Sequence, residues 1–407
     1  MTPQNCAAAL SGAIVFSLTA LAAQELPPHS QWTDRILATV ARDATPTTHA
    51  WDSWVALTPD LSRIAYAARF RAGDVVRETI VDGSERGSEF LYASRPVLSP
   101  NGEHLAYIAV PVGDALPAFL HVGRWRLQIQ IDDRVLGPAW IPVFSPDSRK
   151  IAFLAERPGR HYTVGVVDVD VEPEAVEKSL VWGPEFIDVD RPVWSADSTR
   201  VIYAGARNRH EWVVVVGREP HATFQDATGA RFSPDGTPVF IAFDGKKHFL
   251  VIGHRCQTGF DTVTEPFFRA DGAPVYGASE AGRHYIIAGE ERIRVPHAIE
   301  GVAVSRDGSR TTAWYRDRDR AGQRMVINGV QAGRYYTRIS VPLIHAETGA
   351  YIYTAQDNSR FHVVTSTGES DAYEGVLWNP RIRDDGAVAG YIALNGGRLL
   401  WKVASLR

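Results

Sequence analysis

The stretch ARFSPDGTPVFIAFDGKKHFLVIGHRCQTGFD, residues 230–261, decides the fold of this chain. Its apolar start leads into the turn Ser233-Pro234-Asp235-Gly236, after which a second strand is predicted over Pro238–Phe243. A Gly-Lys-Lys turn follows, then a third strand predicted over Phe249–Gly253 and a short fourth strand near Gly259–Val263. Four antiparallel strands joined by tight turns make one sheet that cannot bury both of its faces alone. If the unit recurs, its copies must therefore pack on one another.

The Ser-Pro-Asp-Gly turn recurs along the whole chain, at intervals of about 40 residues. In such a turn Pro presets φ, Asp or Asn bonds back to the backbone, and Gly supplies a positive φ. The nine copies, of which the last two are degenerate, are Thr58-Pro59-Asp60-Leu61, Ser99-Pro100-Asn101-Gly102, Ser145-Pro146-Asp147-Ser148, Ser195-Ala196-Asp197-Ser198, Ser233-Pro234-Asp235-Gly236, Arg269-Ala270-Asp271-Gly272, Ser305-Arg306-Asp307-Gly308, Ala346-Glu347-Thr348-Gly349 and Arg383-Asp384-Asp385-Gly386.

Each turn is followed by a strand in which small and large residues alternate. Examples are Ile64-Ala65-Tyr66-Ala67, Leu105-Ala106-Tyr107-Ile108 and Ile151-Ala152-Phe153-Leu154. Aromatic side chains then fall on one face and small ones on the other, as expected for stacked sheets with interdigitating faces. No long stretch after Gln24 has a 3.6-residue period, so we expect few helices.

A period of this length with four strands in each unit is typical of a β-propeller. The pattern apolar-Ser-Pro-Asp-Gly-x-x-apolar-Ala-Tyr/Phe also resembles the TolB-type propeller repeat, which occurs in the propeller halves of some peptidases as well. The resemblance covers essentially the whole mature chain and implies a fold rather than a function, because that family mixes scaffolds with enzymes.

The predicted fold is therefore all-β, a single propeller of eight or nine four-stranded blades, with nine favoured. The last unit, from Pro380, has only three strands before the chain ends at Arg407. The segment around Thr47–Ser53 can supply the fourth, so that strands from both termini close the ring. Closure would remove exposed sheet edges that invite aggregation.

The N-terminus differs from the rest of the chain. Ala7–Ala23 is an apolar run with small residues at Ala20 and Ala22, which matches the cleavage pattern of a secretory signal although no Lys or Arg precedes it. We expect residues 1–23 to be a signal peptide, 24–46 an N-terminal tail and 47–407 the propeller, in a periplasmic or secreted protein without a membrane span after cleavage. Cys256 would then be the only cysteine, and no internal disulfide could form.

The predicted turns between the second and third strands of the units are repeatedly basic. The ten residues that we select there as binding candidates are Arg160, His161, Arg209, His210, Lys247, His248, Arg283, His284, Arg324 and Arg360. A ring would gather them at one rim and offer a surface to a polyanionic glycan, a phosphate group or an acidic protein patch. The alternative is that charged residues stand in exposed turns only because such turns face water.

The leading functional hypothesis is a binding or scaffold module for a protein or an anionic glycan, monomeric and without a cofactor, metal or catalytic residue. The alternative is an enzyme, a lyase or hydrolase, that acts on an anionic saccharide at the basic rim. The resemblance to TolB-type repeats includes a polysaccharide lyase with a metal-binding His cluster, which keeps that alternative open. A net charge of −4 does not favour a nucleic-acid partner.

Overall fold

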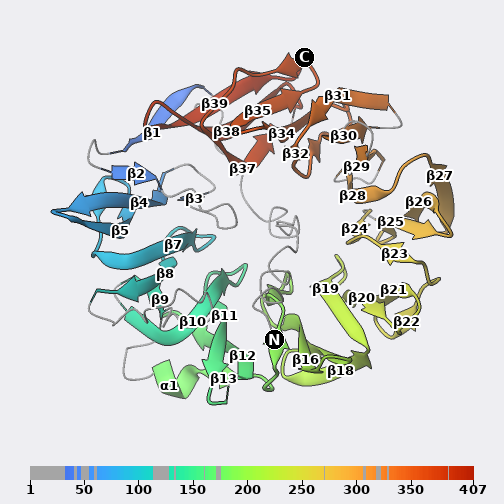
Figure 1. Ribbon diagram of the computed structural model, residues 1–407, viewed down its shortest axis with the longest axis horizontal. Helices are drawn as coiled ribbons and strands as arrows, with labels where there is room; N and C mark the ends of the chain where they lie inside the picture. Colours follow the sequence, from blue (N-terminus) through green and yellow to red (C-terminus); the bar gives the residue numbers. More distant parts are fainter. Residues whose placement is uncertain are drawn as a thin grey trace.

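The computed structural model describes residues 33–40, 44–46, 55–58, 62–112, 128–132, 134–159, 161–170, 176–269, 271–305, 309–317, 322–327, 330–383 and 385–407. The strands in these residues form seven antiparallel sheets that surround a common centre (Figure 1). The one helix within them is α1 (Val176–Ser179), which is four residues long. The all-β prediction and the expectation of few helices are confirmed.

The largest sheet has twelve strands and contains the first three copies of the turn. Its strands are β2 (Ala44–Pro46), β3 (Val55–Leu57), β4 (Ile64–Ala72), β5 (Val75–Asp82), β6 (Glu85–Arg86), β7 (Phe90–Leu98), β8 (Leu105–Pro111), β9 (Gln128–Ile131), β10 (Arg134–Phe144), β11 (Lys150–Arg157), β12 (His161–Asp168) and β13 (Val181–Trp182). Its three copies form one hydrogen-bonded sheet because two strand pairings join them. β5 pairs with β7, and β10 pairs with β9 at its start and with β11 at its end.

Five smaller sheets follow, each with one copy of the turn between an inner strand and the next strand. The first two contain β14 (Asp188–Val189), β15 (Val193–Trp194), β16 (Val201–Asn208), β17 (Glu211–Val216) and β18 (Glu219–Phe224), and then β19 (Asp226–Phe232), β20 (Pro238–Phe243), β21 (His248–Ile252) and β22 (Arg255–Cys256). The other three contain β23 (Thr262–Val263), β24 (Phe267–Phe268), β25 (Pro274–Glu280), β26 (Arg283–Ala288) and β27 (Glu291–Val295); β28 (Ile299–Val304), β29 (Thr311–Asp317), β30 (Gly322–Ile327) and β31 (Val330–Tyr336); and β32 (Arg338–Ile339), β33 (Leu343–Ile344), β34 (Tyr351–Asp357), β35 (Arg360–Thr365) and β36 (Gly368–Glu369).

The stretch 230–261 differs from its prediction at its fourth strand. That strand is β22, residues 255–256, directly after a tight turn at Gly253, whose φ is +60°. Thr262–Val263, at the predicted position, instead forms β23 and begins the next sheet. The prediction was wrong because a two-residue turn reverses the chain earlier than the hydrophobic pattern suggests.

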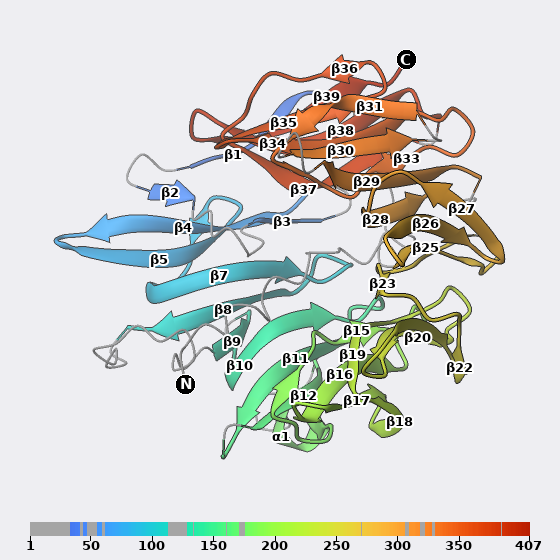
Figure 2. The same ribbon diagram turned by 45° about the vertical axis from the view of Figure 1, so that its right-hand side comes forward.

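The last sheet joins the two ends of the described chain. Its order is β1 (Arg35–Thr39), β39 (Arg398–Ser405), β38 (Val388–Asn395) and β37 (Gly375–Ile382). Figure 2 shows the blue β1 beside the red C-terminal strands. Asp34 adds a hydrogen bond from the backbone N–H of Val403, 2.8 Å away, and an ion pair with Lys402.

The strand that completes this sheet therefore comes from residues 35–39, inside the range predicted as a tail, and not from Thr47–Ser53. Residues 47–53 lie outside the described part of the chain. The tail prediction missed β1 because its sequence, RILAT, is short and has no turn motif beside it.

Apolar clusters lie between successive copies of the unit. One combines Leu154 of β11 with Tyr203 of β16. Another joins the last sheet to the first copy, since Leu394 and Leu399 belong to the same cluster as Tyr66. Both faces of the second strand of a unit are thus covered, which explains the alternation of small and large residues along it.

The turns at one end of the sheets are hydrogen-bonded from copy to copy. In the third and fourth copies Ser148 and Ser198 stand at the glycine position with φ of 66° and 61°. The Ser148 hydroxyl accepts the backbone N–H of Asn101 at 2.9 Å, and the Ser198 hydroxyl accepts that of Asp147 at 3.0 Å. The energetic cost of a positive φ in a residue other than glycine is therefore offset by a hydrogen bond to the preceding copy.

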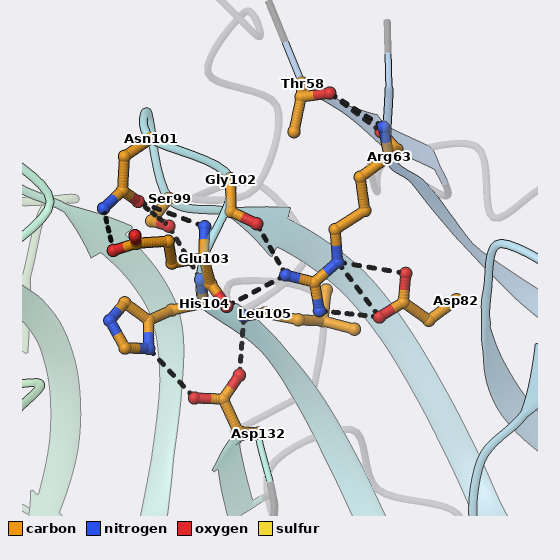
Figure 3. Close-up of polar contacts among 10 residues, drawn as sticks. All are labelled: Thr58, Arg63, Asp82, Ser99, Asn101, Gly102, Glu103, His104, Leu105 and Asp132. Carbon is orange, nitrogen blue, oxygen red and sulfur yellow. Dashed lines mark hydrogen bonds and ion pairs between the residues drawn. The ribbon is translucent and has the colours of Figure 1, made fainter.

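Arginine five residues after the start of a turn makes a second kind of link. Arg63 donates to the carbonyl oxygens of Gly102 at 2.6 Å and Glu103 at 2.9 Å, and Asp82 holds its guanidinium from the other side (Figure 3). Arg310 repeats the contact at the carbonyls of Ala346 and Glu347. The Ser-Pro-Asp-Gly end of the sheets is therefore a structural joint.

Candidate functional site

The predicted binding residues lie at the other end of the sheets, because the turn between the second and third strands is opposite to the Ser-Pro-Asp-Gly turn. We call this end the hairpin edge and define it by the turns β11–β12, β16–β17, β20–β21, β25–β26 and β34–β35. At or beside these turns stand His161, Arg209, His210, Lys247, His248, Arg283, His284 and Arg360. Arg160 lies outside the described residues, and Arg324 lies within β30.

Carboxylates neutralise part of the hairpin edge. His161 lies 3.7 Å from Glu185, which is also 3.5 Å from Arg157. Lys247 lies 2.7 Å from Asp261 and 3.9 Å from Glu280. The acidic partners come from the connections between copies and from neighbouring strands, so they were not visible in the turn sequences themselves.

Asp261 links two copies at this edge. One of its carboxylate oxygens accepts from the Lys247 ammonium group, and the other accepts the backbone N–H of Ala281 at 2.7 Å. The hydrogen bond from Lys247, followed by the one from Ala281, holds the pKa of Asp261 below its usual value. The same bond raises the pKa of Lys247. Lys247 is therefore engaged within the protein, contrary to the simplest form of the binding hypothesis.

The histidines of the edge do not meet. His248 bonds through Nδ1 to the carbonyl of Asp261 at 2.8 Å and packs against Phe243 with the two rings tilted, while His284 bonds through Nδ1 to the Ser279 hydroxyl at 2.9 Å. Among the described residues, no three His, Cys, Asp or Glu side chains are placed to hold a metal ion.

Two further candidates contact their own surroundings. The guanidinium of Arg324 lies 4.8 Å from the centre of the Tyr335 ring. Arg360 donates to the carbonyl of Ala372 at 2.6 Å. These contacts fix strands β30 and β35 against neighbouring segments, so the two arginines do not join the cations described next.

Three successive copies nevertheless leave at the hairpin edge an exposed cation that forms no ion pair with any described residue: Arg209, Lys246 and Arg283. Lys246 has Asp244 nearby, since hydrogen bonds from the backbone N–H groups of Lys247 and Lys246, together with the charge of Lys246, hold the pKa of Asp244 below its usual value. Arg283 and His284 line an open hollow of about 390 Å³, together with Arg294, Val295 and Pro296. Arg294 was not among the candidates because it lies on β27, although its place opposite Tyr285 brings it to the same edge.

An acidic group on the inner strands was also missed. Asp190 follows β14 and faces Thr228 of the next sheet. Burial, together with the carboxylates of Asp188, Asp226 and Glu265, raises the pKa of Asp190 to about 7, against the opposing hydrogen bond from Thr228. The alternating carboxylates 188 and 190 were visible in the sequence, but their acidic neighbours on other sheets were not.

No model of a known protein family and no curated protein matches the chain. Among solved structures it is similar to the β-propeller domain of the Trilobed protease from Pyrococcus furiosus, with 15% identity and a TM-score of 0.41, over 78% of this chain and 98% of that one. It is also similar to TolB from Acinetobacter baumannii, with 15% identity and a TM-score of 0.33, over 63% of this chain and 64% of that one.

A third similar structure is the acylaminoacyl peptidase of Pyrococcus horikoshii, with 14% identity and a TM-score of 0.40, over 74% of this chain and 57% of that one. The described residues contain no helix long and apolar enough to cross a membrane. The ring of antiparallel sheets and the recurring turn identify the fold as a β-propeller.

Proposed function

We propose that this protein is a binding module that holds an anionic partner, on a protein or a glycan, at the hairpin edge of its propeller. The observation that carries the proposal is the run of exposed cations Arg209, Lys246 and Arg283 in three successive copies, none of which forms an ion pair among the described residues. A row of cations on a rigid frame attracts an extended anion, and guanidinium groups bind carboxylates and phosphates through paired hydrogen bonds.

The proposed frame is a closed ring of nine blades, acting as a monomer. Nine copies of the turn support the count. The pairing of β1 with β39 and the apolar cluster shared by Tyr66 and Leu399 support closure between the last blade and the first. A closed ring holds the three cations at fixed spacing, which reduces the ordering cost of binding a long partner.

The proposed location is the periplasm or the cell exterior. The support is the apolar run Ala7–Ala23 with its small residues before position 24, which lies outside the described residues. The test of this part is N-terminal sequencing of the protein recovered from the host: a mature chain that starts near Gln24 is expected, and one that starts at Met1 contradicts it.

The binding test compares two pairs of arginines. In the edge variant, Arg209→Ser and Arg283→Ser remove two unpaired cations from the hairpin edge. In the matched control, Arg218→Ser and Arg255→Ser remove two exposed arginines that also lack an acidic partner among the described residues. They stand at the opposite end of the sheets, Arg218 in the turn before β18 and Arg255 at the start of β22. Both variants change the net charge equally.

Affinity for polyglutamate and for heparin is measured over a series of salt concentrations. The wild type is expected to bind at low salt and to lose affinity as salt rises, since screening weakens exposed charge contacts. The edge variant should lose about tenfold and the control less than about twofold. Equal losses in both variants, or no binding of either polymer at low salt, would reject the proposal.

A further inference from the structure

The outer strand β27 is unlike the other outer strands of the described part of the chain. β6, β13, β22 and β36 are two residues long. The ladder of β18 shifts register beside Pro220, and those of β31 and β1 are also interrupted. Only β27 combines five residues with an unbroken register against its neighbour. Short length, proline and bulges are among the usual protections of a sheet edge; β27 lacks all three and carries only the charges of Glu291, Arg292 and Arg294.

The free side of β27 is open. The strand ends its sheet and lies at the periphery of the ring (Figure 1). Residues Glu291 to Arg294 are all exposed, including the apolar side chain of Ile293 at 42%. No described residue forms a backbone hydrogen bond to this side of the strand.

The register identifies which backbone groups point outward. A two-residue turn joins β26 to β27, and the first pair after it is Ala288 with Glu291. In such a hairpin the first pair exchanges hydrogen bonds and every second residue directs its N–H and C=O away from the partner. Arg292 and Arg294 therefore present the outward donors and acceptors.

The charges at this edge select the chemistry of an added strand. Arg292 is occupied, with its guanidinium 3.7 Å from the centre of the Tyr285 ring and 2.8 Å from Glu280. Arg294 has no acidic partner among the described residues and lines the hollow with Arg283. A carboxylate on an added strand would meet the guanidinium groups of Arg283 and Arg294 where the strand passes the hollow.

We propose that β27 accepts an extended acidic segment of a protein partner as an additional strand, whose carboxylate side chain enters the hollow beside Arg283 and Arg294. The inference rests on the proposed function and narrows it to a protein partner. Backbone hydrogen bonds from the edge supply affinity in this mode of recognition, and the charge contacts supply selectivity.

The test uses a fluorescent seven-residue peptide of alternating Val and Glu, and two substitutions of one residue. Arg294→Ala removes the charge but keeps the outward N–H. Arg294→Pro removes both, and it leaves the ladder to β26 intact because the N–H of residue 294 points away from that strand. An unchanged melting temperature checks that the proline variant is folded. The same peptide with N-methyl groups on alternate residues removes the donors from the other side.

We expect Arg294→Ala to weaken binding by a few fold, and Arg294→Pro and the N-methylated peptide to weaken it by about tenfold or more. Hydrogen exchange at residues 292 and 294 should slow when the peptide binds. If the proline variant fails to fold, the N-methylated peptide and the exchange measurement decide alone.

Three outcomes overturn strand addition: no binding of the peptide at low salt, equal binding of its N-methylated form, or equal effects of proline and alanine at position 294. A uronate polymer that binds the wild type and both variants alike would assign the edge to a glycan. If the N-methylated peptide binds equally well, or if proline and alanine at position 294 have equal effects, a selective loss in the Arg209/Arg283 variant would still uphold the proposed function. No polyanion binding at all would remove both.

Discussion

The ammonium group of Lys247 lies 2.7 Å from a carboxylate oxygen of Asp261, and the other oxygen of that carboxylate receives the backbone N–H of Ala281. One carboxylate thus holds the hairpin turns of two neighbouring copies. A basic turn residue that the sequence offers as a binding group is, in the folded protein, part of the joint between sheets.

Replacing Asp261 should therefore increase the affinity for anions. Asp261→Asn removes one negative charge and frees Lys247, and we expect polyglutamate to bind about threefold more tightly at low salt, with the gain disappearing at high salt. Lys247→Met should change affinity by less than about twofold because that cation is already neutralised. A tenfold loss in Lys247→Met would contradict this assignment.

Asp190 should make the protein less stable as pH rises. Its pKa is about 7 in the folded state and near 3.8 when unfolded, so the folded state binds the proton more tightly. The free energy of unfolding is then unaffected below pH 3.8, falls as pH rises through this window, and stays reduced above pH 7. The full loss is up to about 4 kcal/mol.

Asp190→Asn tests this directly, since it keeps the shape and a partner for Thr228 without the charge. Urea unfolding at about pH 8 should show the variant to be more stable than the wild type, and the difference should shrink towards about pH 4.5. Asp244→Asn, a substitution in an exposed turn, is the control and should show no such gain at pH 8. A difference for Asp190→Asn that is independent of pH would contradict the raised pKa.

Ser198 should respond differently to glycine and to alanine. Alanine loses the hydrogen bond to Asp147 and keeps the cost of a positive φ, whereas glycine loses the bond but removes that cost. We expect Ser198→Ala to lower the free energy of unfolding by about 1–2 kcal/mol and Ser198→Gly to fall between it and the wild type. Denaturant unfolding at one pH measures both; an alanine variant as stable as the glycine variant would refute the account.

Deleting residues up to Thr39 should destabilise the ring. The deletion removes β1 and Asp34, leaving β39 as an exposed edge and uncovering the apolar cluster that contains Leu399. Differential scanning calorimetry should show a lower and broader transition, and so should deletion of Trp401–Arg407. A control that ends the deletion before residue 33 should melt like the undeleted protein. Sharp, unshifted melting of the chain without β1 would show that the ring does not depend on terminal pairing.

Much of the fold can be predicted from short stretches of neighbouring residues. Pro and Gly in the turn at 233–236 and the alternation in Ile64-Ala65-Tyr66-Ala67 depend on neighbouring residues, so they predict hairpins and stacked sheets. The pairing of β1 with β39 joins residues about 360 positions apart and has no such local signal. The same holds for the fourth strand at 255–256, where two residues are too few to show a period.

The candidate site was predictable only in part. Exposed cations at Arg209 and Arg283 follow from turn composition, whereas the neutralisation of Lys247 depends on Asp261, fourteen residues away on a different connection. The outward direction of the Arg294 backbone depends on register, which the sequence of β27 does not reveal by itself.

The contact that Arg63 makes with the next turn uses the carbonyl oxygens of Gly102 and Glu103, and Arg310 uses those of Ala346 and Glu347. Carbonyl oxygens are present whatever side chain a residue carries. Substitutions can therefore accumulate in the receiving turn during evolution without separating adjacent copies, as long as the donor arginine stays. The degenerate copy at 346–349 has no Ser, Pro or Asp in its turn, and Arg310 of the preceding copy still donates to its carbonyl oxygens.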